Sequence, residues 1–406
     1  MNAVFVAPFF METTLRFVDA AAGLPGVQLG LVSQDPEAKL PDGLRAKLAA
    51  HWRLDDGLDP TQIAGAVRAL QDRMGKVERL IGTLEQLQVP LAQVRDELNI
   101  PGMRTEAAIN FRDKAQMKTV LMAAGLPCAR HRLVQEDTQA WEFAASAGYP
   151  LVVKPQAGAG ALNTFRIDSD DELAELLKAQ PPTLQHPALF EEFIVGEEHS
   201  FDSVFVDGKM LWHSISHYLP TPLEVLQNPW IQWVVLLPRV VDDGTYDEIR
   251  ELASSALAAL GMQTGLSHME WFRRPDGSVA ISEVGARPPG AQITTLLSYA
   301  HDVDFYQAWA RLMITGEFTP PERLFSVGAA FIRGQGRGRV SAITGIDRLD
   351  DVAPLVVEAR LPQEGQAPTG TYEGDGYVIV RHPETSVVEH ALAKIVTSIR
   401  VELATQ

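Results

Sequence analysis

Cysteine is nearly absent from this chain of 406 residues, which holds only Cys128. A single thiol excludes a disulfide within the chain and is typical of a reducing compartment. The start of the sequence has neither the basic segment nor the full apolar segment of a secretory signal, and no apolar run approaches the length of a membrane span. We therefore expect a cytoplasmic protein without a membrane partner.

Basic residues are also scarce, since 35 Lys and Arg stand against 52 Asp and Glu, for a formal net charge of −17. No basic stripe is long enough to follow a phosphate backbone, so a nucleic acid is not an expected partner. The negative charge opposes nucleotide binding, and any ATP site must be neutralised locally by lysines, arginines and metal ions. The length of the chain predicts two or three domains packed together.

The order of expected elements predicts a multidomain α/β and α+β protein. A strand at 3–7, a helix at 12–22 and a strand at 27–32 are typical of a doubly wound start. Further on, the turn Asp207-Gly208 predicts a hairpin in a largely antiparallel sheet. The expected parts are an N-terminal α/β domain, a linker helix with a small α+β lid, a central sheet with helices and a C-terminal subdomain packed on that sheet, over residues 1–105, 106–196, 197–318 and 319–406.

Two glutamates, Glu270 and Glu283, are predicted to face each other across one β-hairpin. Asp276-Gly277 is among the strongest two-residue hairpin signals, and a turn of only these residues sets the two glutamates directly opposite. Two like charges about 5 Å apart repel by roughly 3 kcal/mol at an effective dielectric of 20. A hard cation such as Mg²⁺, completed by phosphate oxygens and water, would neutralise them. A solvated acidic hairpin is the alternative.

The alternation of side chains along this hairpin predicts which residues share the face of the two carboxylates. His268 and Phe272 share it with the first carboxylate, and Val279 and Ile281 share it with the second. We therefore expect a face that is partly apolar. A histidine in such a place is either a functional group or a satisfied buried side chain, and both interpretations stay open for His268.

A glycine-bearing loop follows Lys154, which ends a short apolar strand. Gly158 and Gly160 would let backbone N–H groups approach phosphate oxygens, and the lysine would supply a point charge. The loop lacks the Gly-Lys-Ser/Thr of a P-loop and leads into a strand, so it is neither a Walker A motif nor a Rossmann fingerprint. An ordinary hairpin loop with a solvated lysine is the alternative.

An acidic run from Glu191 to Glu198 begins as a strand and reaches a glycine, as a hinge between domains would. A backbone left exposed there could read an adenine edge, and the Glu198 carboxylate could accept both ribose hydroxyls. A solvated acidic surface run is the alternative.

Five strings along the chain resemble the ATP-grasp superfamily and, within it, the carboxylate–amine ligases of the L-amino acid ligase type. Each string is weak alone, but their order and spacing agree, and the resemblance covers nearly the whole chain. The strings are FRDKAQMK, YPLVVKPQAGAG, LFEEFIVGEEHSFD, GLSHMEWF and ISEVGARPPG.

The resemblance implies a nucleotide site, a metal site and a small catalytic set. Glu270 and Glu283 match the ligands of Mg²⁺, with Mn²⁺ as an alternative ion. Arg287 matches the arginine that stabilises the transferring phosphoryl group or the substrate carboxylate, and His268 resembles a histidine that shapes the acceptor site. The nucleotide positions are Lys114 and Lys154 for phosphates, Gly158 and Gly160 in the loop above them, Glu191, Glu192 and Ile194 for adenine, and Glu198 for the ribose.

The implied reaction joins a small carboxylate, expected to be an amino acid, to an amine at the expense of ATP. Many members carry an asparagine ligand two residues after the second glutamate, where this chain has Gly285. The alternatives are another enzyme of this architecture, such as a carboxylase or a ligase for other acids, and a protein that binds ATP with little turnover. Arg287 could also pair with a structural acid. A homodimer is a further expectation.

Overall fold

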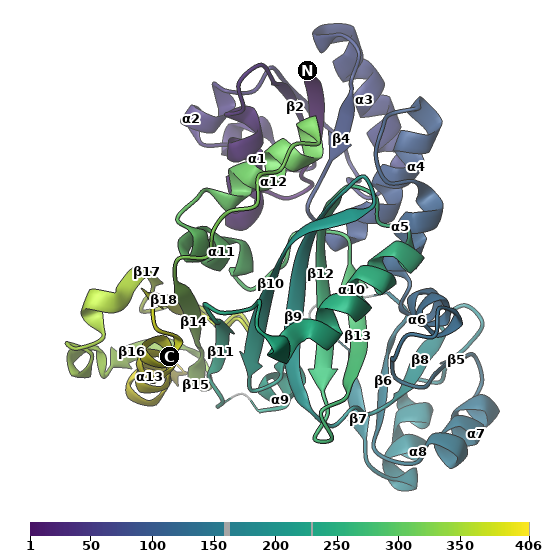
Figure 1. Ribbon diagram of the computed structural model, residues 1–406, viewed down its shortest axis with the longest axis vertical. Coiled ribbons are helices and arrows are strands. Elements are labelled where there is room, and N and C mark those ends of the chain that lie inside the picture. The colour runs from purple at the N-terminus through teal and green to yellow at the C-terminus, as the bar shows by residue number, and fades with distance from the viewer. Residues whose placement is uncertain (158–162, 229, 406) are drawn as a thin grey trace.

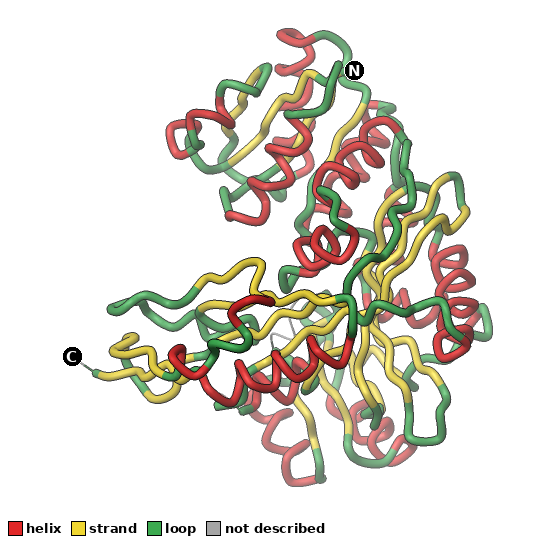
Figure 2. Tube along the Cα trace, turned by 60° about the vertical axis from the view of Figure 1, so that its left-hand side comes forward, coloured by secondary structure: helices red, strands yellow, loops and turns green. Residues whose placement is uncertain are grey.

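The computed structural model describes residues 1–157, 163–228 and 230–405, which form four β-sheets surrounded by helices (Figure 1). The largest sheet lies in the middle of the molecule, with the N-terminal part above it (Figures 1 and 2). The predicted multidomain α/β and α+β fold is confirmed. Among the described residues, no helix is both long and apolar enough to cross a membrane.

A parallel sheet forms the N-terminal part, and its central strand is apolar on both faces. Val4 and Val6 pack in the core under α3 and α4, whereas Ala3 and Phe5 pack in the core that includes α1. In sheet order the strands are β3 (Ala50–Arg53), β2 (Gln28–Ser33), β1 (Asn2–Val6) and β4 (Arg79–Ile81). The helices are α1 (Glu12–Ala22), α2 (Asp42–Arg45), α3 (Pro60–Met74), α4 (Gln88–Leu98) and α5 (Thr105–Arg112).

The lid follows, with an antiparallel sheet at the lower right of Figure 1. Its linker helix begins where predicted because the Asp113 side chain accepts hydrogen bonds from the backbone N–H groups of Ala115 and Gln116. The backbone N–H of Lys114 also donates to the carbonyl of Gln156 (3.0 Å), which brings this helix to the end of β6. The elements are α6 (Lys114–Ala123), β5 (His131–Val134), α7 (Asp137–Ala147), β6 (Leu151–Pro155), β7 (Phe165–Ile167), α8 (Asp170–Ala179) and β8 (Ala188–Glu192).

The central sheet has antiparallel neighbours throughout, and one of its faces packs on α10. Ile249 and Leu257 of that helix lie in one core with Phe201, Met269 and Trp271 of the sheet. In sheet order the strands are β13 (Val279–Gly285), β12 (Gly265–Arg273), β9 (Glu197–Val206), β10 (Lys209–Leu219), β11 (Trp233–Leu237), β14 (Ser326–Ile332), β18 (Gly376–His382) and β17 (Val356–Arg360). The helices are α9 (Pro222–Gln227), α10 (Asp247–Leu260), α11 (Ile293–His301) and α12 (Phe305–Thr315).

The C-terminal segment does more than pack on the central sheet, because it supplies the last three strands of that sheet, β14, β18 and β17. The helix expected near the C-terminus is present as α13 (Thr385–Ser398), and it packs on β14 and β18. A small separate sheet contains β15 (Gly334–Gly336), β19 (Arg400–Ala404) and β16 (Arg339–Thr344). The four domain boundaries stay predictions.

The glutamate hairpin has a longer turn than predicted. The backbone N–H of Gly277 donates to the carbonyl of Arg274 (2.9 Å), and the N–H of Arg274 donates to the carbonyl of Ser278 (2.8 Å), so the loop has three residues instead of two. A shift of register farther along β13 restores the pairing of Glu270 with Glu283. The predicted pair is therefore confirmed, while the predicted two-residue turn is wrong.

The shift of register also changes which side chains share the face of the two carboxylates. Ser282 is the extra residue of a bulge in β13, and the bulge breaks the alternation of two. Val279 and Ile281 consequently lie in the core on the side of α10, so the prediction for these two residues is wrong. His268 and Phe272 line the cavity on the carboxylate face, as predicted.

Candidate active site

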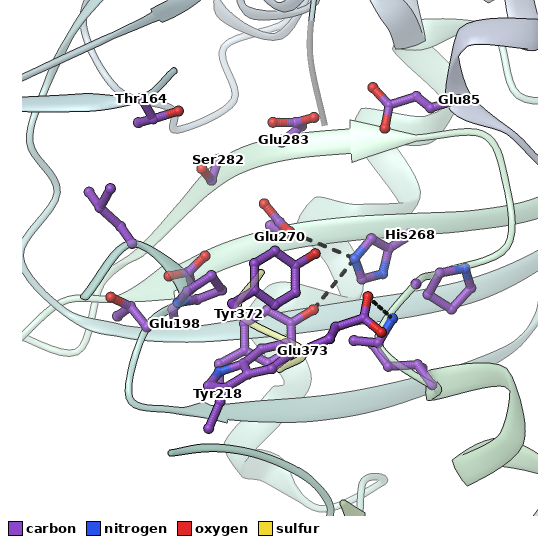
Figure 3. Close-up of a pocket in the computed structure, with 18 of the residues that line it drawn as sticks. Glu85, Thr164, Glu198, Tyr218, His268, Glu270, Ser282, Glu283, Tyr372 and Glu373 are labelled. Carbon is purple, nitrogen blue, oxygen red and sulfur yellow. Dashed lines mark hydrogen bonds and ion pairs between the residues drawn. The ribbon is translucent and has the colours of Figure 1, made fainter. Parts of the chain in front are cut away.

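One cavity of about 1120 Å³ is lined by residues from the N-terminal part, the lid and the central sheet (Figure 3). It brings together every predicted site residue that the structure describes, whereas Gly158 and Gly160 lie outside the described residues. The predicted residues that line it are Lys114, Lys154, Glu191, Glu192, Ile194, Glu198, His268, Glu270, Glu283 and Arg287.

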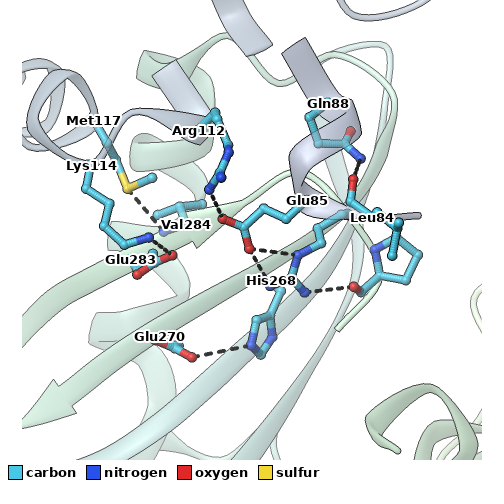
Figure 4. A network of polar contacts seen from close by, with 12 residues as sticks. Leu84, Glu85, Gln88, Arg112, Lys114, Met117, His268, Glu270, Glu283 and Val284 are labelled. Carbon is cyan, nitrogen blue, oxygen red and sulfur yellow. Dashed lines mark hydrogen bonds and ion pairs between the residues drawn. The ribbon is translucent and has the colours of Figure 1, made fainter. Parts of the chain in front are cut away.

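The paired glutamates differ in how their charges are balanced. The Lys114 ammonium lies 2.6 Å from a Glu283 carboxylate oxygen (Figure 4). Burial alone would raise the pKa of Glu283, but Lys114 and Lys154 lower that pKa to about 2. The ion pair found for Glu270 is a long contact of 3.8 Å with the Nε2 atom of His268. Glu283 is therefore a fixed anion with a cation beside it, whereas the ion pair that the described residues give Glu270 is with a histidine.

A third carboxyl group, that of Glu198, lies near the two glutamates. Burial, together with the nearby charge of Glu270, raises the pKa of the Glu198 carboxyl well above its usual value. In the described part of the chain, no three His, Cys, Asp or Glu side chains are grouped closely enough to hold a metal ion alone. Two carboxylates that leave positions for phosphate oxygens and water are the donor set that suits Mg²⁺. The Glu270–Glu283 pair fits that ion.

A buried pair of lysines surrounds Glu191 at the lid end of the cavity. The ammonium groups of Lys154 and Lys118 lie 3.0 Å and 3.4 Å from the same carboxylate oxygen of Glu191. Lys118 also donates to the carbonyl of Ser282 (3.0 Å), and its side chain is 1% exposed. Burial alone would raise the pKa of Glu191, but the two lysines lower it. The carboxylate thus holds Lys154 at the end of β6.

The sequence analysis did not identify Lys118 as a site residue, although the position of this lysine on a helix indicates that it is buried. It follows Lys114 by one helical turn, and it lies between Met117 and Leu121, which are both buried. A lysine on the buried stripe of a helix requires a buried partner, because an unpaired charge there is costly. That rule indicates a charged cluster behind the cavity.

The segment from Glu191 to Glu198, which the sequence predicts to be a hinge, contributes residues to the cavity wall. The Glu192 carboxylate accepts a hydrogen bond of 2.6 Å from the Nε atom of Arg130, so its side chain is already engaged. Ile194 lines the cavity two residues later. Adenine recognition by backbone groups of these residues stays a prediction.

Arg287 pairs with an acid that the sequence analysis did not identify. Its Nη2 and Nε atoms lie 2.8 Å and 3.2 Å from one oxygen of Glu85, and Arg112 contacts the other oxygen at 2.6 Å (Figure 4). Burial alone would lower the pKa of Arg287, but Glu85 raises it. The expected alternative of a structural ion pair is therefore present, and Arg287 still lines the cavity.

His268 is held by a buried carboxylate on the neighbouring strand. Its Nδ1 atom lies 2.7 Å from Asp202, which is fully buried and also accepts a hydrogen bond from the Ser200 hydroxyl (3.0 Å). Its Nε2 atom lies 3.4 Å from the Tyr218 hydroxyl. Burial alone would lower the pKa of His268, but Asp202 and Glu270 raise it to about 9. The imidazole is consequently a fixed cation whose Nε2 side faces Tyr218 and Glu270.

The chain is similar to known proteins in sequence. Residues 113–207 match the family described as the carbamoyl-phosphate synthase L chain, ATP binding domain. The L-arginine-specific L-amino acid ligase of Bacillus subtilis is 27% identical over 334 residues, which cover 79% of this chain and 79% of that protein.

Solved structures share the fold. The L-amino acid ligase from Bacillus licheniformis matches with a TM-score of 0.78 and 20% identity, over 100% of this chain and 98% of that one. The biotin carboxylase domain of the Hydrogenobacter thermophilus 2-oxoglutarate carboxylase, in complex with MgADP, ADP and bicarbonate, matches with a TM-score of 0.67 and 18% identity, over 98% and 90% of the two chains. The matching domain, the relative and the shared fold agree with the resemblance to the ATP-grasp superfamily that the sequence predicted.

Proposed function

We propose that the protein is an ATP-dependent ligase that joins the carboxylate of an amino acid to an amine, with release of ADP and phosphate. One observation carries the proposal, namely that the Glu270–Glu283 pair faces the same cavity as Lys154. An acidic pair close to buried lysines suits a polyphosphate that arrives with a divalent cation. The relatives that are ligases support amide-bond formation as the reaction.

The lysines of the cavity would exchange partners when ATP binds. Lys114 and Lys154 now contact Glu283 and Glu191, and phosphate oxygens would take over part of these contacts. Ile194 lines the cavity where the adenine is expected, and Glu198 would accept the ribose hydroxyls. A hydroxyl donor would also stabilise the charged form of Glu198, whose pKa burial now raises.

Glu270 and Glu283 would hold Mg²⁺, with Mn²⁺ as an alternative. When bound, this ion neutralises charge on the phosphate oxygens during transfer. Gly285 adds no side-chain ligand, although a Cβ atom there would meet only ordinary contacts, at 3.5 Å from Cγ and 3.8 Å from Nε of Arg287. Phosphate oxygens and water would therefore complete the ligands of the ion, in place of an asparagine.

The reaction would proceed in two displacements. A carboxylate oxygen of the acid forms a bond to the γ-phosphorus while the bond from that phosphorus to the bridging oxygen breaks, so that ADP leaves and an acyl phosphate remains. The nitrogen of the amine then forms a bond to the acyl carbon, the bond from that carbon to the phosphate oxygen breaks, and inorganic phosphate leaves with the proton that the amine loses. Arg287 would orient the acid carboxylate, and the fixed charge of His268 would stabilise negative charge that develops on the acyl oxygen.

Phosphate release measured over an array of acids and amines tests the proposal. We expect release only when an acid and an amine are both present, with an amide as the product found by mass spectrometry. Release that requires bicarbonate would instead indicate a carboxylase. ATP binding without release across the array would indicate a binding protein. The homodimer and the cytoplasmic location stay predictions.

A further inference from the structure

One carboxylate in the cavity plays no part in the functions above. Glu373 lies in the segment between β17 and β18 and lines the cavity together with Tyr372 (Figure 3). One of its oxygens accepts a hydrogen bond from the backbone N–H of Ala291 (3.3 Å). In the described part of the chain, this carboxylate forms no ion pair.

No residue outside the described part could neutralise Glu373 either. The segment 158–162 reads Gly-Ala-Gly-Ala-Leu, and the two single residues are Pro229 and Gln406, so none of them is a lysine, an arginine or a histidine. Burial accordingly raises the pKa of Glu373 above its usual value, with one opposing contribution from the N–H of Ala291. The protein alone leaves this charge without a counterion.

The position of Glu373 is fixed by the residues that follow it. Gly374 has φ +65°, and a Cβ atom there would lie 2.6 Å from the carbonyl oxygen of Ile332, so no other residue fits without a shift of the backbone. The buried Asp375 accepts hydrogen bonds from the backbone N–H groups of Thr369 (2.7 Å) and Gly334 (3.1 Å). Such anchoring suits a recognition group more than a solvated loop.

Three aromatic side chains line the cavity together with Glu373. The ring of Trp233 lies 4.8 Å from that of Tyr372 and 5.4 Å from that of Tyr218, and all three residues line the cavity. Aromatic faces attract cations, and more strongly where water is excluded. An anion next to such rings is suited to a positive group that carries an apolar body.

Glu373 also contacts the turn that carries Arg287. The turn runs from Arg287 through Gly290 to Ala291, and a Cβ atom on Gly290 would lie 3.8 Å from a Glu373 oxygen. Arg287 is suited to a carboxylate and Glu373 to a cation. Arg287 on the turn and Glu373 beside it thus present opposite charges to one cavity, as the binding of a zwitterion requires.

We propose that Glu373 binds a positively charged group of the amino acid substrate, an ammonium or a guanidinium. The inference rests on the proposed ligase function for its choice of substrate class. The C-terminal segment would then select the substrate, while the lid and the glutamate hairpin hold the nucleotide.

Four acids of equal chain length separate the two places where the cation could be. L-lysine has both an α-ammonium and a terminal ammonium, L-norleucine has only the first, 6-aminohexanoate has only the second, and hexanoate has neither. Their binding to the full chain, measured by calorimetry with Mg²⁺ and a non-hydrolysable ATP analogue, is compared between wild type and Glu373→Gln. The amide keeps an oxygen for the N–H of Ala291 and removes only the charge.

We expect Glu373→Gln to weaken the binding of L-lysine about 10- to 100-fold, because a hydrogen bond to a charged group is lost. Loss for 6-aminohexanoate but not for norleucine identifies the terminal ammonium, and the reverse identifies the α-ammonium. Hexanoate binding should not change. Glu224→Gln, which removes another carboxylate from the cavity wall, is the matched control and should change none of the four.

Equal weakening of all four acids, no weakening of any, or no measurable binding of any acid to wild type overturns the proposal. Thermal melting of Glu373→Gln shows that the variant is folded. Because the assay measures binding, its result is separate from that of the ligase function. If the protein releases no phosphate with any acid and amine, the ligase reaction is refuted. The proposed role of Glu373 still holds if Glu373→Gln shows the expected loss of L-lysine affinity.

Discussion

The two faces of the central sheet carry buried histidines whose pKa values are shifted in opposite directions. His268 on β12 faces the cavity and pairs with Asp202, which raises the pKa of the imidazole to about 9 against the effect of burial. His199 on the adjacent β9 faces the other way, stacks on Trp271 with 4.5 Å between ring centroids, and has its pKa lowered to about 3 by burial. Burial alone lowers the pKa of an imidazole and keeps it neutral, whereas a buried carboxylate beside it raises the pKa and keeps it protonated at neutral pH.

The same division holds for the other side chains of these strands. The cavity face carries Glu198 and Glu270, while the face toward α10 carries Phe201, Met269 and Trp271. Alternate side chains of one strand therefore face the cavity or pack in the core against α10. Substitutions on the cavity face should alter turnover, and substitutions on the α10 face should alter stability.

The largest expected effect is that of Glu283→Gln, on the cavity face. It removes one charge from the proposed metal site, and we expect a decrease in kcat of about 100- to 1000-fold, as for other electrostatic groups at reacting phosphates and oxyanions. Phosphate release measures the rate, and thermal melting checks the fold. Turnover at the wild-type rate would contradict the metal assignment. Glu224→Gln is again the matched control.

On the opposite face, Trp271→Ala should decrease stability and leave turnover nearly unchanged. Trp271 is fully buried and packs with α10, so its loss should decrease the free energy of unfolding by about 3–5 kcal/mol. At a temperature where the variant is folded, kcat should stay within a few-fold of wild type. Urea unfolding measures the first quantity. Trp141→Ala, at an exposed position on α7, is the control. A variant with normal stability and abolished turnover would contradict the division.

The hairpin that carries the two glutamates could be predicted from sequence, because Asp276-Gly277 signals the turn, but their direct pairing follows from two departures that cancel, since the three-residue loop alone would set Glu270 opposite Ser282. The faces on which the side chains of β13 lie could not be predicted from sequence. The extra residue Ser282 reverses the alternation of faces, and the pattern of residue types does not indicate it. Its effect is visible in Val279 and Ile281, which lie in the core instead of the cavity. Strands β3 and β4 were also missed, and at four and three residues they are too short to show a period.

The acidic residues that form ion pairs with the site residues could not be predicted either, for a different reason. Asp202 contacts a histidine 66 residues away, and Glu85 contacts an arginine 202 residues away. Such contacts depend on how strands and domains meet, and local composition does not record that. Glu373 belongs to the same class, since its segment enters the cavity only because β17 and β18 join the central sheet.

A smaller effect is expected from Lys118→Met, because this lysine serves both stability and the site. Methionine keeps much of the volume, while Glu191 keeps Lys154 as its remaining partner. We expect a loss of about 1–3 kcal/mol in the free energy of unfolding and an increase in the KM for ATP, since one charged hydrogen-bond partner is lost. Lys178→Met, at an exposed position on α8, is the control. An unchanged KM would show that Lys118 has only a structural role.

An effect of similar size concerns the pH dependence of stability and tests the neutral histidines of the α10 face. Burial, aided by Arg273, lowers the pKa of His217 to about 4, against an ordinary value near 6.5. Between these values the unfolded chain binds a proton that the folded chain does not, so stability is complete above pH 6.5 and decreases as the pH is lowered toward 4. His217→Phe should reduce this decrease, by up to about 3 kcal/mol, although it loses the contact of 2.9 Å with the Tyr246 hydroxyl at every pH.

Urea unfolding of wild type and variant at pH 7 and pH 5 measures the difference. Equal slopes would show that His217 accepts a proton in the folded chain, and the contrast between the two faces would then be limited to His199.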